Sequence, residues 1–205
     1  MKKYIPLHQC PICRQLGENE FGSYAVMASR PSYPLPPEAD KLERFDPPGH
    51  QSSDTHHLRR CPICGLFYRY VEHYEYDVTG SDDELYLTRL TLTETRPYLS
   101  EAEFRQRLAH FDAELTSPHA NTKGYAAKCL MAHFLAQEDA ARAIQIINSE
   151  DEATQTAVLR YLDAVTEAHW RLDNKALIQQ VVDTAVPTKA THPLIKRILW
   201  RCGLK

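Results

Sequence analysis

The sequence is poor in glycine and carries no excess of positive charge. Only 7 of its 205 residues are glycine, and none of them lies in a phosphate-binding loop, a nucleophile elbow or a Walker motif. The formal net charge is −3 at pH 7, and an acidic chain has little tendency to bind nucleic acid or an anionic membrane nonspecifically. The sequence therefore offers no recognisable catalytic motif and disfavours a charge-driven nucleic-acid partner.

Long apolar runs are also missing. The longest uncharged segments, such as residues 129–137, are far shorter than the roughly 18 apolar residues that a membrane-spanning helix needs. The first residues, Met-Lys-Lys-Tyr-Ile-Pro, carry the charges of a secretory signal, but no apolar stretch follows them before His8. We therefore expect a soluble, cytoplasmic protein with no membrane partner.

Four of the six cysteines stand in two copies of one tetrapeptide. These are Cys10-Pro11-Ile12-Cys13 and Cys61-Pro62-Ile63-Cys64, and Gly65 follows the second copy. Four thiolates in two pairs suit a tetrahedral Zn²⁺ ion with Zn–S distances of about 2.3 Å. With these motifs the chain resembles the zinc-ribbon class, whose Cys-Pro-x-Cys-Gly knuckles lead into β-hairpins. The resemblance covers about residues 8–95, identifies no specific family, and implies one zinc ion held by Cys10, Cys13, Cys61 and Cys64.

The spacing between the two knuckles departs from the common pattern. Forty-seven residues separate Cys13 from Cys61, whereas two-knuckle sites commonly use about 15 to 20. The extra loop-closure entropy is only about 0.9 kcal/mol, against about 10 to 16 kcal/mol from a structural zinc ion. The long insertion is therefore compatible with a shared metal site.

Other uses of the four cysteines were weighed against zinc. Disulfides are disfavoured because no secretory signal precedes the motifs. Iron is a minor alternative, because residues 61–68 also resemble a rubredoxin knuckle. A site with four cysteines leaves no position open for water, so we predict a structural ion rather than a catalytic one.

Strand and loop signals occupy the first half of the chain. Residues 66–78 alternate with a period of two and are rich in tyrosine, and residues 85–93 are predicted as the return strand of a hairpin. Residues 79–83 are predicted as the turn between these strands, and Phe21–Ser29 as a further candidate strand. Six of the 13 prolines fall in residues 31–48, so residues 31–56 are predicted as an extended polar loop.

Helical signals occupy the second half. Ser100 with Glu103 and Ser149 with Glu152 have the spacing of capping boxes, and five or six helices are predicted after Pro97. We therefore predict an α+β fold, in which an N-terminal zinc ribbon with a β-hairpin and a long inserted loop precedes a C-terminal α-helical bundle or short helical solenoid. The predicted domains are residues 1–97, with the loop at 31–56, and residues 98–205.

Several other residues are weaker candidates for function. Arg14, Arg59, Arg60 and Arg69 could contact nucleic acid or another anion, and Asp82, Asp83 and Glu84 could dock a basic partner from the tip of the hairpin. The tyrosines of the first predicted strand, Tyr68, Tyr70, Tyr74 and Tyr76, could stack on bases, although core packing is the more common role. His50, Asp54, His56 and His57 could hold a second metal ion, but such residues are more often solvent-exposed. Cys129 and Cys202 are expected to be buried in helices.

These features favour a non-catalytic zinc-binding protein-interaction module. It would act by docking or occlusion, as an adaptor or as an antagonist, and a bacterial toxin-neutralising immunity protein is one setting for such a build. One alternative is a zinc-ribbon protein that binds nucleic acid in transcription or RNA processes, which the net charge disfavours. The other is an enzyme that uses zinc only structurally, for which the sequence holds no catalytic constellation.

Overall fold

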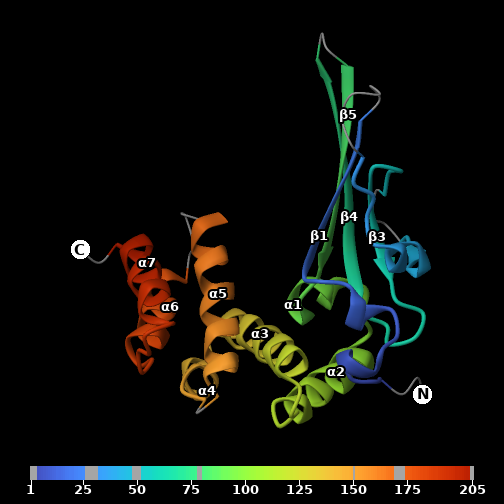
Figure 1. Cartoon of the computed structure of the whole chain (residues 1–205). Coiled ribbons are helices and arrows are strands. Elements are labelled where there is room, and N and C mark those ends of the chain that lie inside the picture. The colour runs from blue at the N-terminus through green and yellow to red at the C-terminus, as the bar shows by residue number, and fades with distance from the viewer. Residues whose placement is uncertain are drawn as a thin grey trace. The chain divides into compact units, whose positions relative to one another are not determined.

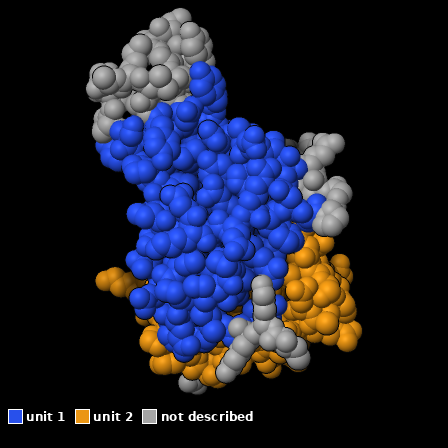
Figure 2. Space-filling view, turned by 90° about the vertical axis from the view of Figure 1, so that its right-hand side faces the viewer, with its two compact units in different colours: residues 1–90 blue, residues 91–205 orange. Residues whose placement is uncertain are grey.

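In a computed structural model the chain divides into two compact units, residues 1–90 and 91–205 (Figures 1 and 2). The structure describes residues 4–25, 32–47, 52–77, 80–149, 151–168 and 174–203, and for residues 25, 75–77 and 80–82 it describes the backbone only. The division lies before the predicted boundary at residue 97. Thr91 and Glu94 form a capping box that starts helix α1, Leu92–Thr95, directly after the last strand.

Unit 1 contains a five-stranded antiparallel sheet in the order β1-β5-β4-β3-β2. Its strands are β1 (Asn19–Ala25), β2 (Glu43–Phe45), β3 (His56–Arg60), β4 (Phe67–Asp77) and β5 (Gly80–Arg89). The predicted hairpin is present as the β4–β5 pair at the centre of the sheet. Because β3 pairs with β4 only as far as Val71, the far parts of β4, β5 and β1 continue beyond β3 as a three-stranded ribbon (Figure 1).

The predicted position of the hairpin turn was wrong. Asp77 pairs with Gly80, so the strands are joined through residues 78 and 79, which lie outside the described residues. Asp83 and Glu84 lie within β5, where their backbones pair with both β4 and β1. This pairing satisfies their backbone donors and acceptors on both sides, which outweighs the low strand propensity of aspartate. The acidic segment is therefore part of a central strand and not the tip of a hairpin.

The prediction of an extended loop over residues 31–56 was also too simple. The segment contains a 3₁₀ helix, η3 (Pro37–Lys41), and the short strand β2. β2 has no proline and lies at the edge of the sheet, where a short strand needs only one partner. The chain also crosses β1 at Gly22, where an added Cβ would come within 3.0 Å of the Leu35 backbone nitrogen. This close approach favours glycine at position 22.

All the regular secondary structure that the structure describes in unit 2 is helical. After α1 come the 3₁₀ helix η4 (Arg96–Tyr98) and six α-helices: α2 (Glu101–Glu114), α3 (Ala120–Ala136), α4 (Ala140–Ile147), α5 (Glu152–Ala168), α6 (Lys175–Asp183) and α7 (His192–Cys202). Helix α3 packs against α1, α2, α4 and α5, and α5 lies between α3 and the α6–α7 pair (Figure 1). The buried core includes Leu130, Met131, Ile147, Leu159 and Ile198.

One predicted capping box is confirmed and the other is wrong. Ser100 and Glu103 cap the start of α2 reciprocally. At α5, the backbone N–H of Thr154 donates to the carboxylate of Asp151 across 2.9 Å. Asp151, rather than Ser149, therefore caps this helix. Asp151 precedes Thr154 by three residues, so its carboxylate accepts from an N–H that has no partner within the helix, and its negative charge suits the positive end of the helix dipole.

Both arginines of the last helix, Arg197 and Arg201, pair with residues of unit 2 itself. Arg197 forms a bidentate ion pair with Asp163 of α5, with its shorter contact at 2.6 Å. Arg201 donates to the same carboxylate and to the Asp163 backbone carbonyl, both across 2.8 Å. These contacts join α7 to α5 and leave the two guanidinium groups with partners inside the unit.

Candidate metal centre

The four cysteines of the two knuckles meet in one buried cluster. Their sulfur atoms all lie within 4.8 Å of one another, with Cys10 and Cys61 separated by 3.6 Å and Cys13 and Cys64 by 3.4 Å. In a tetrahedral zinc site with Zn–S distances of about 2.3 Å, the sulfurs are about 3.8 Å apart. The observed separations bracket this value and are far longer than a disulfide bond. The cluster therefore fits a single tetrahedral metal ion.

Local backbone contacts shape both knuckles. In the first, the N–H of Cys13 donates to the sulfur of Cys10 across 3.4 Å. In the second, Gly65 adopts a φ of 74°, and its N–H donates to the carbonyl of Cys61 across 2.9 Å. This left-handed conformation turns the chain from the second knuckle into β4 and explains the glycine at this position. Since β3 ends at Arg60, the sheet itself positions Cys61 and Cys64.

The electrostatics of the cluster favour a divalent cation. Hydrogen bonds with Cys13 and Cys64 lower the pKa of Cys61, whereas the hydrogen bond with Cys61 raises the pKa of Cys13. The pKa of Cys64 is raised through its hydrogen bond with Cys13. The buried thiols thus compete, because ionising one makes it harder to ionise its neighbours. A metal ion of charge +2 removes this competition by stabilising all four thiolates together.

Two residues behind the cluster were missed as part of the site. The hydroxyl of Tyr68 on β4 hydrogen bonds with the sulfur of Cys13, and burial raises the pKa of this tyrosine. Arg89 on β5 donates to the Tyr68 hydroxyl, to the carbonyl of Cys13 across 3.1 Å, and to the carbonyl of Leu16. The two side chains therefore hold the first knuckle against the sheet. The available signal was a single arginine beside Leu85, Leu87 and Leu90 in a strand pattern.

The predicted tyrosine row has a mixed environment. Tyr68 and Tyr70 are buried, as core packing requires, whereas Tyr74 is 63% exposed. The side chain of Tyr76 lies outside the described part of the chain. The row leaves the core because β4 extends beyond β3 at Tyr74.

The candidate histidines that the structure describes, His56 and His57, do not form a second metal site. Both ring nitrogens of His57 have partners, since Nδ1 lies 3.1 Å from the carbonyl of Asp54 and Nε2 accepts from Arg59 Nε across 3.2 Å. As adjacent strand residues, His56 and His57 lie on opposite faces of the sheet. His50 lies outside the described residues. Among the residues that the structure describes, the four cysteines are the one group of three or more potential ligands gathered together.

The four candidate arginines do not gather on one surface. Arg14 is exposed on the short helix η2 (Cys13–Gln15). Arg59 donates to the carbonyl of Ala39 and lies over the ring of Tyr70, while Arg60 lies on the opposite face of β3 over the ring of Phe67. Arg69 is exposed on β4, on the same face as Arg60.

The acidic candidates lie in β5 and are also separated by the pleat. Asp83 and Glu84 are half-buried and point to opposite faces, and the side chain of Asp82 lies outside the described part of the chain. The carboxylate of Glu84 accepts a hydrogen bond from the Tyr86 hydroxyl across 2.6 Å.

The two remaining cysteines lie in helices. Cys129 is fully buried in α3, which confirms the expectation of a core residue, while Cys202 at the end of α7 is only partly buried.

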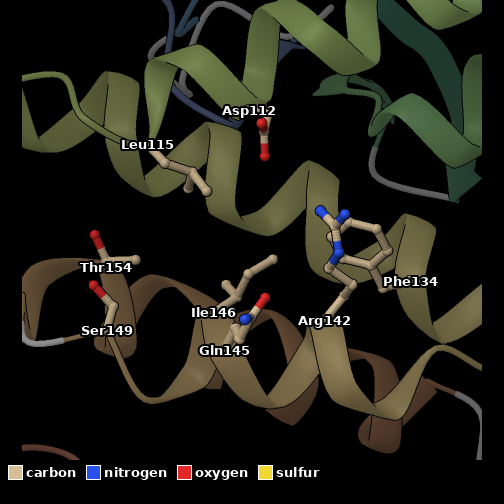
Figure 3. A pocket seen from close by; sticks show the side chains of 8 residues that line it. All are labelled: Asp112, Leu115, Phe134, Arg142, Gln145, Ile146, Ser149 and Thr154. Carbon is tan, nitrogen blue, oxygen red and sulfur yellow. The ribbon is translucent and has the colours of Figure 1, made fainter.

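Unit 2 has a small open cavity among α2, α3, α4 and the start of α5 (Figure 3). Its volume of about 190 Å³ is below the range of about 300–1,000 Å³ that is usual for small-molecule sites. The guanidinium of Arg142 lies over the ring of Phe134 at its rim. The lining residues are Asp112, Leu115, Phe134, Arg142, Gln145, Ile146, Ser149 and Thr154. The cavity is too small to indicate a cofactor or substrate site.

No protein-family model matches the chain, and no curated protein or solved structure is significantly similar to it. Within the described residues, none of the helices combines the length and the apolar character needed to cross a membrane.

Proposed function

We propose that this protein is a non-catalytic interaction module in which one structural Zn²⁺ ion, held by Cys10, Cys13, Cys61 and Cys64, stabilises unit 1 for docking to another protein. The observation that carries the proposal is the burial of all four sulfur ligands in one closed cluster. A closed set of four thiolates leaves no coordination position for a substrate or a water molecule. The ion would contribute folding free energy rather than chemistry.

The surface of the ribbon supports docking as the function of unit 1. Exposed large aromatic side chains lie along β1, β5 and the far part of β4, with Phe21 and Tyr86 on one face of the sheet and Tyr24 and Tyr74 on the other. Aromatic residues are enriched at protein interfaces because they bury a large area at a low cost in conformational entropy. A partner bound to either face would have its own contact surface blocked by unit 1 and would undergo no reaction.

The first experiment measures the metal. Protein purified without added metal should be colourless and contain one equivalent of zinc. A red protein with an iron–thiolate absorption spectrum would show that the site holds iron and not zinc. Cys202→Ser is the matched control for Cys13→Ser, because Cys202 belongs to unit 2 and is not a member of the cluster. Only Cys13→Ser should lower the zinc content.

The second experiment tests docking itself. Affinity capture from native lysate should yield a stoichiometric protein partner that binds the zinc-loaded form and is released on chelation. Capture of nucleic acid in place of protein, with binding that weakens steeply as salt rises, would support the nucleic-acid alternative instead. Failure to capture any partner would contradict the proposal.

A further inference from the structure

A tyrosine hydroxyl behind the metal centre connects a buried arginine to one of the four sulfurs. The Nε of Arg89 on β5 donates to the hydroxyl oxygen of Tyr68 on β4 across 3.1 Å, and the Tyr68 hydroxyl hydrogen bonds with the sulfur of Cys13. The strand register places Tyr68 directly opposite Arg89, and both side chains are buried. We call this chain of contacts the Arg89–Tyr68–Cys13 relay.

The contacts of the relay fix the direction of its hydrogen bonds. A phenolic hydroxyl has one proton to donate, and its oxygen accepts through its lone pairs. Arg89 can only donate, because a guanidinium group has no acceptor. The oxygen of Tyr68 is therefore the acceptor toward Arg89, and its single proton is directed to Cys13. A thiolate accepts such a proton in a charge-assisted hydrogen bond, which is stronger than one between neutral groups.

The relay gives Cys13 a donor of the kind that the backbone gives to two other ligands. The sulfur of Cys10 accepts from the N–H of Cys13 across 3.4 Å. The sulfur of Cys61 accepts from the backbone N–H groups of Ile63 and Cys64. In both cases the donor belongs to the same knuckle as its sulfur, whereas the donor to Cys13 comes from a side chain on β4. Four thiolates around one divalent cation carry an excess of negative charge in a buried place, so each donor aimed at a sulfur stabilises them.

We infer that Tyr68 and Arg89 are positioning residues that strengthen metal binding through Cys13. The Tyr68 proton stabilises the thiolate form of Cys13, in which this residue binds a metal ion. The positive charge of Arg89 polarises the Tyr68 hydroxyl, which makes it a stronger donor, and offsets part of the negative charge of the ligands. Arg89 also donates to the carbonyl of Cys13 across 3.1 Å, which holds this residue in register with the relay. The inference rests on the proposed function and gives the pair a role in metal affinity beyond the packing of the knuckle.

The test compares Tyr68→Phe with Tyr70→Phe in the full chain, loaded with Zn²⁺ or with Co²⁺. Tyr70 is the matched control, because it is buried on the same face of β4 and its hydroxyl donates to Glu72 across 3.3 Å rather than to a sulfur. In competition with a chromophoric chelator, Tyr68→Phe should lower the zinc affinity by about 10- to 100-fold, the usual effect of removing a group that hydrogen bonds to a metal ligand. Tyr70→Phe should lower the zinc affinity less.

A second readout separates the relay from a purely structural role. Zinc binding is linked to folding, so any variant that destabilises unit 1 also loses some zinc affinity. The sulfur-to-cobalt charge-transfer band of the Co²⁺ form reports the thiolates themselves, because a thiolate that loses a hydrogen bond gives up an electron more easily. Tyr68→Phe should move this band to longer wavelength, and Tyr70→Phe should leave it in place. Arg89→Met should move it in the same direction by a smaller amount, because the Tyr68 hydroxyl remains.

If Tyr68→Phe does not fold, the wild type loaded with NMR-active cadmium decides the matter. One tyrosine hydroxyl proton should then exchange slowly with water and couple to the cadmium nucleus through the sulfur. Absence of that coupled proton would overturn the inference, as would a cobalt band or a zinc affinity that Tyr68→Phe and Tyr70→Phe change equally. The proposed function fails separately. Wild-type protein that holds no metal ion would refute the structural site, whereas zinc-loaded wild type with an unmoved cobalt band in Tyr68→Phe would preserve the interaction module and overturn the relay.

Discussion

The Nε of Arg89 donates a hydrogen bond to the hydroxyl oxygen of Tyr68 across 3.1 Å, and both side chains are buried behind the metal ligands. Arg89 also donates to two backbone carbonyls of the first knuckle. A buried guanidinium group is costly unless its donors have partners, and here three oxygens accept from it. This network joins β5, β4 and the segment that carries Cys10 and Cys13.

Replacing Arg89 should destabilise unit 1. Arg89→Met leaves the Tyr68 hydroxyl and two carbonyls with fewer partners, so we expect a loss of about 2–4 kcal/mol in the free energy of unfolding. Tyr68→Phe removes one of these hydrogen bonds and should cost about 1–2 kcal/mol. Urea denaturation of the zinc-loaded protein measures both losses.

Arg44→Met is the matched control for this experiment. Arg44 lies in the same sheet on β2, but its ion pairs with Asp46 and Asp54 are exposed to solvent. Such pairs contribute about 0–1 kcal/mol. An Arg89→Met variant that is no less stable than Arg44→Met would show that the buried network does not hold the knuckle.

Removing zinc should unfold unit 1 before unit 2. The ion would bring about 10 kcal/mol or more of apparent binding free energy, which exceeds the net stability of many small domains. The strands that the structure describes all belong to unit 1, and the α-helices all belong to unit 2. Chelation should therefore reduce the strand signal in circular dichroism while the helical signal is kept. Simultaneous loss of both signals would contradict independent stabilisation of unit 1 by the metal.

The sequence contained enough information to group the four cysteines and to place the central hairpin. Two identical tetrapeptides with a two-residue spacer specify a metal site locally, and the alternation of residues 66–78 specifies a strand whatever its partners are. The capping box at Ser100 likewise depends on four consecutive residues. The strand and the cap are confirmed because each rests on short-range geometry, and the four sulfurs are gathered as a metal site requires.

The rest depended on contacts between distant residues. β2 lies in a proline-rich segment and is stabilised by pairing with β3, and Asp83 and Glu84 are held in β5 by two neighbouring strands. Arg89 supports the first knuckle only because the fold brings β5 next to the carbonyls of Cys13 and Leu16, which lie more than 70 residues earlier in the sequence. Tertiary pairing overrides local propensity at all three places, and no local signal reports it.

The two helix caps make a separate prediction for unit 2. Asp151→Ala removes the acceptor for the Thr154 N–H, and should cost about 1 kcal/mol. Ser149→Ala, at the position first predicted as the cap, should cost less because it removes only a long hydrogen bond from the Asp151 N–H at 3.4 Å. The helical signal in circular dichroism during urea denaturation compares the two variants. A larger loss for Ser149→Ala would restore the original capping assignment.

The stability of unit 2 should fall as the medium becomes acidic, because of His133 on α3. Partial burial lowers the pKa of His133, the positive charge of Arg96 lowers it further, and Asp139 opposes the change. The folded state therefore binds a proton less readily than the unfolded state, whose histidine has a pKa of about 6.5. The resulting stabilisation is complete above that value and is lost as the pH falls below it towards the folded pKa. His133→Gln should reduce the difference in urea midpoint between pH 7.5 and pH 5.5, whereas the exposed His192→Gln in α7 should retain the wild-type difference. If both variants keep the wild-type difference, some group other than His133 governs the acid sensitivity of unit 2.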